Sequence, residues 1–576
     1  MNKNISNIIS IAILLMLVYS MFFIEKEPKK YLPLTPYTYD IVIKNGLIYD
    51  GSGTKPFMGD VGIIDDKIAY VGKSKNLKSK RTIYAFGKAV SPGFINMLSW
   101  AVDDVIIDGR SQGDIRQGVT LQVFGEGVSM GPLNDEMLEN RSANGLGVGD
   151  AGYDLNWVTL GEYLQFLEDK GVSNNVASFV GATTLRIHQV GYENRPPTET
   201  ELDSMKMLVR QAMEEGAMGI GSSLIYAPAF YAATDELIEL CKVAAEYGGM
   251  YISHIRSEGN RFLESVDELI TIASEAGIDA EIYHLKAGGK DNHYKLDLVI
   301  DKVDSARSAG LNITADMYTY TAGATGLDAS MPPWVQEGGY DEWKRRLLDP
   351  EIRAQVMKEI NTPTDEWENL YLQAGSASKM ILVGFANPDL RYLTGKTLQE
   401  AADILKKDPV ETMMDLVIED GSRVGTVYFI MSEENIKKKI AIPWMRFGSD
   451  AGSMTPEGVF LESNTHPRAY GNFARLLGKY VRDEGIISLE EAIKKLTSNP
   501  AKTLKIKNRG VLKEGYYADV VIFDKNTIKD HSTFSKPHQF STGVKHVIVN
   551  GMHVLKNGFH TGETPGKFIK GPGFKE

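Results

Sequence analysis

Residues 250–288 read MYISHIRSEGNRFLESVDELITIASEAGIDAEIYHLKAG, and this stretch decides the fold. A short apolar strand followed by His254 and a second one followed by His284 flank a helical segment at 261–276. The apolar residues of that segment recur on one helical face: Phe262, Val266, Leu269, Ile270 and Ala273. Gly277 follows where a helix C-terminal glycine belongs. The pattern predicts a strand-helix-strand unit with a histidine at the end of each strand.

The same alternation continues on both sides of this stretch and indicates a parallel sheet closed into a barrel. We expect barrel strands at 93–98, 120–124, 176–180, 217–221, 250–253, 280–283, 311–316 and 445–449. Eight such strands with intervening helices predict an α/β fold, the (β/α)8 TIM barrel. In such a barrel the side chains that follow the strands meet at one mouth, so His254 and His284 are expected to face each other.

Short alternating segments near both chain ends indicate a second, smaller domain. They lie at 39–50, 60–64, 67–71, 518–523 and 544–554, with Asn-Gly turns in the first and last. We predict a composite β-sandwich domain and a C-terminal tail from residues 37–91 plus 508–576, with the barrel at 92–507 inserted between. Residues 331–440 are too many for one strand-to-helix connection and are predicted to form an insertion that shapes the substrate pocket.

Composition describes an ordinary globular enzyme. Of the 576 residues, 43% are hydrophobic and 24% are charged. The 63 basic and 75 acidic residues leave a net charge of −12, which argues against nucleic acid as a partner. A single cysteine, Cys241, excludes an internal disulfide framework.

The N-terminus departs from this composition. Residues 8–24 carry no charge and follow Lys3, a pattern of either an uncleaved signal-anchor or a cleaved signal peptide. We favour the signal-anchor because no small-x-small cleavage site stands out. Both alternatives predict an exported, extracytoplasmic body, with a membrane anchor at 8–24 in the favoured case. Residues 1–36 are therefore assigned to this segment and its linker.

Four side chains at the predicted strand ends form a set that can bind metal. Glu126, His254 and His284 provide a carboxylate and two imidazoles, which suit one divalent ion, with zinc favoured. Asp450 is the natural general base and acid beside such an ion. The alternatives are a structural turn aspartate at Asp450 and a loop glutamate at Glu126.

Several motifs that occur in one order resemble those of the N-acyl-D-amino-acid deacylases (D-aminoacylases) of the amidohydrolase superfamily. They are Ser91-Pro92-Gly93-Phe94-Ile95, Gly216-Ala217-Met218-Gly219-Ile220, Ser253-His254-Ile255-Arg256, His284-Leu285-Lys286, Tyr318-Thr319-Tyr320, Gly448-Ser449-Asp450 and His466-Pro467-Arg468. The resemblance covers nearly all of the chain from Tyr39 onward. It implies hydrolysis of the amide of a small N-acylated D-amino acid by a metal-activated water.

The chain also departs from that family. The resemblance implies an Asp-x-His-x-His motif after the first strand, but residues 96–100 read NMLSW, so one of two metal sites cannot form. Glu126 matches the family's bridging cysteine, and Ala182 stands where a histidine is common. We expect Leu98 and Trp100 to fill the vacated space with apolar bulk. The remaining set predicts a single-metal enzyme.

Substrate-binding residues follow from the same resemblance. It implies that Lys286, together with Tyr226 and Tyr320, holds the carboxylate of the amino acid. Arg186 and Arg468 are further candidates, and for each the alternative is a structural ion pair.

Three functions stay open at this point. The first is a metal-dependent deacylase of N-acyl-D-amino acids. The second is an amidohydrolase that acts on a cyclic amide or another N-acyl compound. The third is a non-catalytic binding homologue, suggested by the missing histidines after the first strand.

Overall fold

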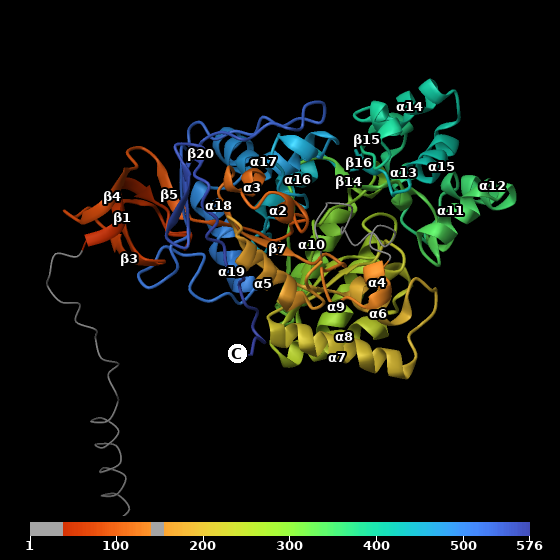
Figure 1. Cartoon of the computed structure of the whole chain (residues 1–576), viewed down its shortest axis with the longest axis horizontal. Helices are drawn as coiled ribbons and strands as arrows, with labels where there is room; N and C mark the ends of the chain where they lie inside the picture. The colour runs from red at the N-terminus through yellow and green to blue at the C-terminus, as the bar shows by residue number, and fades with distance from the viewer. Residues whose placement is uncertain (1–37, 140–154, 576) are drawn as a thin grey trace, which may run out of the picture.

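A computed structural model describes residues 38–139 and 155–575 (Figure 1). The predicted N-terminal anchor or signal at 1–36 lies outside these residues. Among the described residues, no helix has the length and apolar character needed to span a membrane.

The predicted TIM barrel is confirmed. Its parallel strands are β6 (Phe94–Asn96), β7 (Val119–Phe124), β8 (Asn175–Ser178), β9 (Val180–Gly181), β10 (Gly219–Ser223), β11 (Met250–His254), β12 (Asp279–Ile282) and β13 (Ile313–Ala315). The predicted strand at 176–180 is split, since β8 pairs with β7 while β9 pairs with β10. The predicted eighth strand closes the barrel: Arg446 N donates to Ala315 O at 2.7 Å, and Met97 N donates to Phe447 O at 3.1 Å.

Long amphipathic helices cover the outside of the barrel. They include α5 (Leu160–Lys170), α7 (Glu199–Glu215), α8 (Thr234–Glu246), α9 (Phe262–Ala276) and α10 (Lys295–Ser308). Helix α9 buries the predicted stripe, except that Ile272 replaces Ile270 on the buried face. It ends at Gly277 with φ +63°, as predicted. The single Cys241 is buried in α8, where desolvation raises the pKa of its thiol.

Shorter helices join these elements and complete the barrel. They are α2 (Asp104–Ile107), α3 (Gln112–Ile115), α4 (Asp135–Glu139), α6 (Ala182–Val190), α16 (Glu433–Ala441), α17 (Arg468–Arg475), the π-helix η8 (Leu476–Asp483), α18 (Leu489–Leu496) and α19 (Ser498–Thr503).

Strands from near both ends of the described chain meet in one sheet, the small β-domain at the left of Figure 1. Its strands are β1 (Thr38–Ile48), β2 (Phe57–Ile64), β3 (Lys67–Gly72), β4 (Lys78–Tyr84), β5 (Ala89–Pro92), β17 (Val520–Phe523), β18 (Val544–Val549), β19 (Met552–Lys556) and β20 (Phe559–His560). The two ends join where β17 runs antiparallel to β5. β-Branched residues from both ends, such as Ile43, Val61 and Val520, form its buried core.

A separate lobe rises over the barrel mouth on the side opposite the β-domain (Figure 1). It has an antiparallel sheet of β14 (Gly323–Gly326), β16 (Gly425–Tyr428) and β15 (Met380–Gly384) and its own apolar core. Its helices are α11 (Tyr340–Leu348), α12 (Pro350–Ile360), α13 (Leu370–Ala374), α14 (Leu398–Leu405) and α15 (Pro409–Asp420). Pro350 and Pro409 stand at the first positions of α12 and α15, where the fixed φ of proline suits a helix start.

Asn96 joins the first and last barrel strands. Its side chain donates to Ser449 Oγ at 2.8 Å and accepts from Ser449 N at 2.8 Å. The same Asn96 amide donates to Asp114 Oδ1 at 3.1 Å. Burial raises the pKa of Asp114 to about 7, although Ser453 and Asn96 lower it. The barrel closure therefore rests against a carboxyl group that the fold prefers to keep protonated.

The variant Asp114→Asn is expected to reduce the pH dependence of stability between pH 4 and 7. The folded chain keeps the Asp114 proton up to about pH 7, whereas the unfolded chain releases it near pH 3.8. The free energy of unfolding of the wild type therefore falls as pH rises through this window, by at most about 1.4 kcal/mol per pH unit from this group. Denaturant unfolding at several pH values measures the slope.

The control is Asp40→Asn, since Lys80 lowers the pKa of Asp40 in the folded chain, and above about pH 5 the group is ionised in both the folded and the unfolded chain. For Asp40→Asn, the free energy of unfolding should change with pH as steeply as it does for the wild type. Equal slopes for Asp114→Asn and the wild type would contradict the assignment.

Candidate metal and catalytic site

Glu126 reaches the barrel mouth because two glycines let the chain turn sharply after β7. Gly125 and Gly127 have φ of +106° and +73°. A Cβ at Gly125 would lie 2.4 Å from Phe179 O, and one at Gly127 would lie 2.4 Å from Ser223 Cβ. Larger residues would therefore clash with the neighbouring strands, and the Gly-Glu-Gly sequence places the carboxylate at the mouth.

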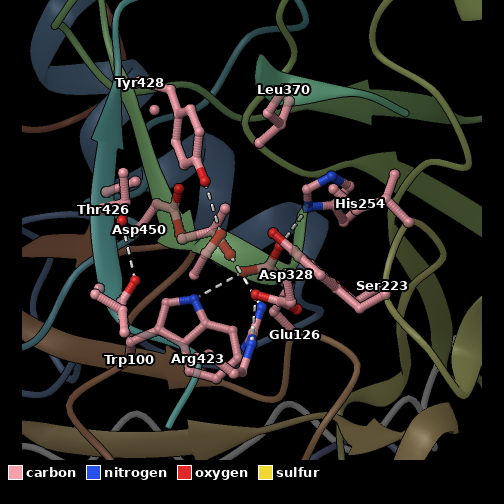
Figure 2. Close-up of a pocket in the computed structure, with 18 of the residues that line it drawn as sticks. Trp100, Glu126, Ser223, His254, Asp328, Leu370, Arg423, Thr426, Tyr428 and Asp450 are labelled. Atoms are coloured by element: carbon pink, nitrogen blue, oxygen red, sulfur yellow. Dashed lines mark hydrogen bonds and ion pairs between the residues drawn. The ribbon is translucent and has the colours of Figure 1, made fainter. Parts of the chain in front are cut away.

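Glu126, His254 and His284 converge there as predicted. Glu126 Oε1 lies 2.7 Å from His284 Nε2 and 3.1 Å from His254 Nδ1. The imidazole rings meet edge to face with centroids 4.4 Å apart. One ligand atom from each residue lies within 4.8 Å of the others, and all three side chains are buried. Figure 2 shows Glu126 and His254 pointing into the same cavity.

Two site residues sit in strained backbone conformations. His284 has φ +34° and Asp450 has φ +51°, in the left-handed region that non-glycine residues rarely adopt. Hydrogen bonds hold both: His284 N donates to Asp316 Oδ1 at 3.0 Å, and Asp450 N donates to Leu98 O at 2.9 Å. Strain of this kind persists only where the surroundings impose it, and it is concentrated at functional sites.

The electrostatics of the cluster favour an ionised carboxylate. Burial by itself raises the pKa of Glu126, but the charges and hydrogen bonds of His284 and His254 hold it well below its usual range. Burial and Lys286 lower the pKa of His284, yet Glu126 and Glu258 outweigh them and raise it to about 10. A cationic group is thus strongly favoured between these carboxylates.

The donor set fits a divalent metal ion. Two imidazoles and a carboxylate are the ligand types that zinc takes in hydrolases. His254 Nε2 is buried without a hydrogen-bond partner, and its nearest carboxylate oxygen, Glu258 Oε2, lies 3.6 Å away. A buried imidazole nitrogen without a hydrogen-bond partner is a costly arrangement that metal binding would relieve.

The sequence did not point to Glu258, which proves to be a central residue of the site. It accepts two hydrogen bonds from Lys286 Nζ, at 2.6 and 2.8 Å, and one contact of 3.1 Å joins it to His284 Nδ1. Burial would raise the pKa of Glu258, but Lys286 and the two histidines lower it. The one clue in the sequence is that Glu258 follows His254 by four residues. Because this segment is a loop, it has no regular pattern that predicts where the side chain points.

Trp100 differs from the expectation of apolar filling. Leu98 is fully buried, but Trp100 is 37% exposed and lines the cavity. Its indole Nε1 donates to Glu126 Oε2 at 2.7 Å (Figure 2). The indole therefore holds the carboxylate oxygen that faces away from the histidines. Such outer contacts orient metal ligands.

Asp450 shares this cavity, which has a volume of about 650 Å³. Its Oδ2 forms an ion pair of 2.6 Å with Arg468 Nη1, and Arg468 stacks over Tyr318 with 4.4 Å to the ring centroid. Tyr226 packs edge-on against His254 at 5.4 Å. Burial raises the pKa of Asp450, an effect that Arg468 opposes. The structure thus brings Asp450, Lys286, Tyr226 and Arg468 to the cavity with the three ligands.

Two predicted substrate residues do not line the cavity. Arg186 is buried in α6, where it forms a 2.7 Å ion pair with Glu236 and binds backbone carbonyls. Tyr320 points towards Asp530, with 3.3 Å between Oη and Oδ2. Tyr318 faces the cavity in its place. Because tyrosines stand at both 318 and 320, the sequence does not show which of the two side chains points into the cavity. Likewise, nothing in the sequence shows that Arg186 is buried in an ion pair and not exposed to substrate.

Known proteins have sequences similar to this chain over most of its length. Residues 353–555 match the model of the amidohydrolase family. The D-aminoacylase of Alcaligenes xylosoxydans xylosoxydans is 29% identical over 534 residues, which cover 92% of this chain and 97% of that protein. The N-acyl-D-glutamate deacylase of the same organism is 29% identical over 90% of this chain and 93% of its own length. The chain is a homologue of the D-aminoacylases.

Solved structures agree with this assignment. The N-acyl-D-glutamate deacylase of Bordetella bronchiseptica, solved with zinc and a phosphonate inhibitor, superposes on this D-aminoacylase homologue with a TM-score of 0.77. The two are 27% identical, and the match covers 93% of this chain and all of the other.

In the D-aminoacylase homologue, Trp100→Phe is expected to weaken the binding of a divalent metal ion, with zinc as the probe, about tenfold or more, because Glu126 loses the donor that orients it. Competition with a zinc chelator measures the dissociation constant.

Trp334→Phe is the matched control. Its indole Nε1 donates to Glu359 Oε2 at 2.8 Å within the insertion, so it loses the same kind of bond at a distance from the ligands. Zinc affinity of Trp100→Phe equal to that of the control would refute the orienting role.

Proposed function

We propose that this chain is a hydrolase of linear amides that uses one zinc ion to deacylate N-acyl-D-amino acids. The observation that carries the proposal is the buried convergence of Glu126, His254 and His284 on one cavity with Asp450. The homologues with deacylase activity in their names support the reaction class. The cavity volume of about 650 Å³ lies within the range of small-molecule sites, about 300–1,000 Å³.

Glu126, His254 and His284 are the residues that would hold the ion. When bound, zinc would polarise the amide carbonyl and lower the pKa of a water molecule. We propose one ion and not two because two carboxylate oxygens that a second ion could use already have partners. Trp100 Nε1 donates to Glu126 Oε2, and Arg468 Nη1 pairs with Asp450 Oδ2.

Asp450 is assigned the proton transfers. Its carboxylate would accept a proton from the attacking water and return it to the amine that leaves. Arg468 holds Asp450 at one oxygen and leaves the other to act. The raised pKa of Asp450 suits this exchange, since a group that both takes and gives a proton works best near the operating pH.

Lys286, Arg468 and Tyr318 are the candidates for the substrate carboxylate. Lys286 Nζ lies 5.9 Å from the Tyr318 ring centroid, so the three groups surround one region of the cavity. Because Glu258 already neutralises Lys286, the ammonium would recognise the carboxylate through hydrogen bonds as much as through net charge.

Asp450→Asn is expected to lower kcat for N-acetyl-D-amino acids by about 100- to 10,000-fold while zinc stays bound, because the carboxamide cannot accept the proton. Turnover of an N-acetyl-D- and N-acetyl-L-amino-acid panel, together with zinc content, measures both effects. The wild type should favour the D series.

Asp524→Asn is a suitable control, because Asp524 forms a 2.7 Å ion pair with Lys88 outside the cavity. Full activity of Asp450→Asn would reject its role. If the protein hydrolyses cyclic amides but no linear amide, an amidohydrolase of cyclic amides is favoured. If it binds zinc but hydrolyses neither kind of amide, a non-catalytic binding homologue is favoured.

A further inference from the structure

Three cation-carboxylate pairs line the cavity. Lys286 pairs with Glu258 at 2.6 Å, Arg468 with Asp450 at 2.6 Å, and Arg423 Nε with Asp328 Oδ1 at 2.9 Å. The side chains of Lys286 and Arg468 are only 5% and 4% exposed, whereas that of Arg423 is 44% exposed. Of the three cations, Arg423 is therefore the one most open to a ligand that enters the cavity.

The described residues do not engage all the hydrogen-bond donors of the Arg423 guanidinium. Nη2 donates to Thr325 Oγ1 at 3.2 Å, and Nε faces Asp328. Among the described residues, Nη1 has no hydrogen-bond partner. The remaining N–H groups can donate to a carboxylate, for which the planar guanidinium is well suited.

The backbone holds Arg423 in place. The next residue, Val424, is buried with φ +54°, a conformation that a β-branched residue adopts only when its surroundings impose it. Arg423 O accepts from Leu327 N at 2.7 Å, and a Cβ added at Gly326 would lie 2.6 Å from Arg423 Cβ. Strain and close packing at the start of β16 thus position this side chain.

Arg423 also lies near the proposed metal ligands. Its guanidinium stacks on Tyr226 at 4.9 Å from the ring centroid, and Tyr226 meets His254 edge-on at 5.4 Å. One aromatic ring therefore separates Arg423 from a ligand, and Figure 2 shows Arg423, Asp328 and Glu126 around the same space. A substrate whose amide lies at the ligands can reach Arg423 with its far end.

We propose that Arg423 binds a second carboxylate of the substrate, distinct from the α-carboxylate. This inference rests on the proposed deacylase function. The second carboxylate can come from an acidic D-amino acid side chain or from the end of a dicarboxylic acyl group.

Two substrate pairs separate these sources. N-acetyl-D-glutamate is compared with N-acetyl-D-glutamine, and N-succinyl-D-leucine with its terminal amide, so each pair differs in one charge. In the wild type, kcat/KM should favour the charged member of one pair by about 10- to 100-fold, as expected for hydrogen bonds to a charged group. Arg423→Gln should abolish that preference, mainly through a higher KM. The pair that responds identifies the source.

Arg345→Gln is the matched control, because Arg345 is an exposed arginine of the same insertion and pairs with Glu342 outside the cavity. It should keep the wild-type preference. If Arg423→Gln does not fold, Arg423→Lys serves instead, and it should reduce the preference because an ammonium lacks the planar fork.

If the wild type hydrolyses the panel without preference in either pair, or Arg423→Gln keeps the preference, the subsite is refuted while the deacylase function stands. If the wild type hydrolyses none of these compounds, the deacylase proposal fails. Glutarate binding, measured by calorimetry, then tests Arg423 alone: binding lost in Arg423→Gln supports the subsite, and equal or absent binding in both proteins overturns it.

Discussion

The Glu126 carboxylate contacts both imidazoles, and much of the structure is arranged to make that contact. It requires the ends of β7, β11 and β12 to stop at one level, which a closed parallel barrel provides. It also requires a glycine on each side of Glu126, because any larger residue would meet neighbouring strands. The buried charge would be unfavourable alone, and the two histidines, with Trp100, compensate its desolvation.

The buried charges around the three candidate ligands are compensated in the same way. Each buried charged group of the cavity has an opposite partner, as with Lys286 and Glu258 or Arg468 and Asp450. Because breaking such a pair leaves an isolated charge in a poor solvent, the pairs keep the side chains in fixed positions. A substrate therefore meets a pre-formed pattern of donors, which reduces the reorganisation needed during reaction.

The insertion contributes the part of the cavity that is least constrained by the barrel. Its sheet carries Thr325, Thr426 and Tyr428 to the cavity wall, and Arg423 precedes its strand β16. The lobe has a core of its own, so a substitution among its cavity-facing residues need not displace the metal-ligand candidates on the barrel. This separates recognition of the substrate from the chemistry of the amide.

The sequence by itself determined the barrel, the β-domain from both chain ends, and the convergence of Glu126, His254 and His284. Local periodicity reports which face of a helix is buried, and strand ends of a parallel barrel share one mouth. Loops carry no such periodicity. Sequence reasoning therefore missed Glu258 and chose Tyr320 where Tyr318 faces the cavity. It also placed Arg186 in the substrate site, because nothing in the sequence distinguishes a buried arginine of a helix from one that binds a ligand.

Only the tertiary structure decided which groups pair. Glu126 and His284 are 158 residues apart, and Trp100 meets Glu126 across 26. A hydrogen bond depends on distances of a few tenths of an ångström between side chains on different elements. No pattern along the chain specifies these distances, because they result from the packing of the barrel, the loops and the insertion against one another.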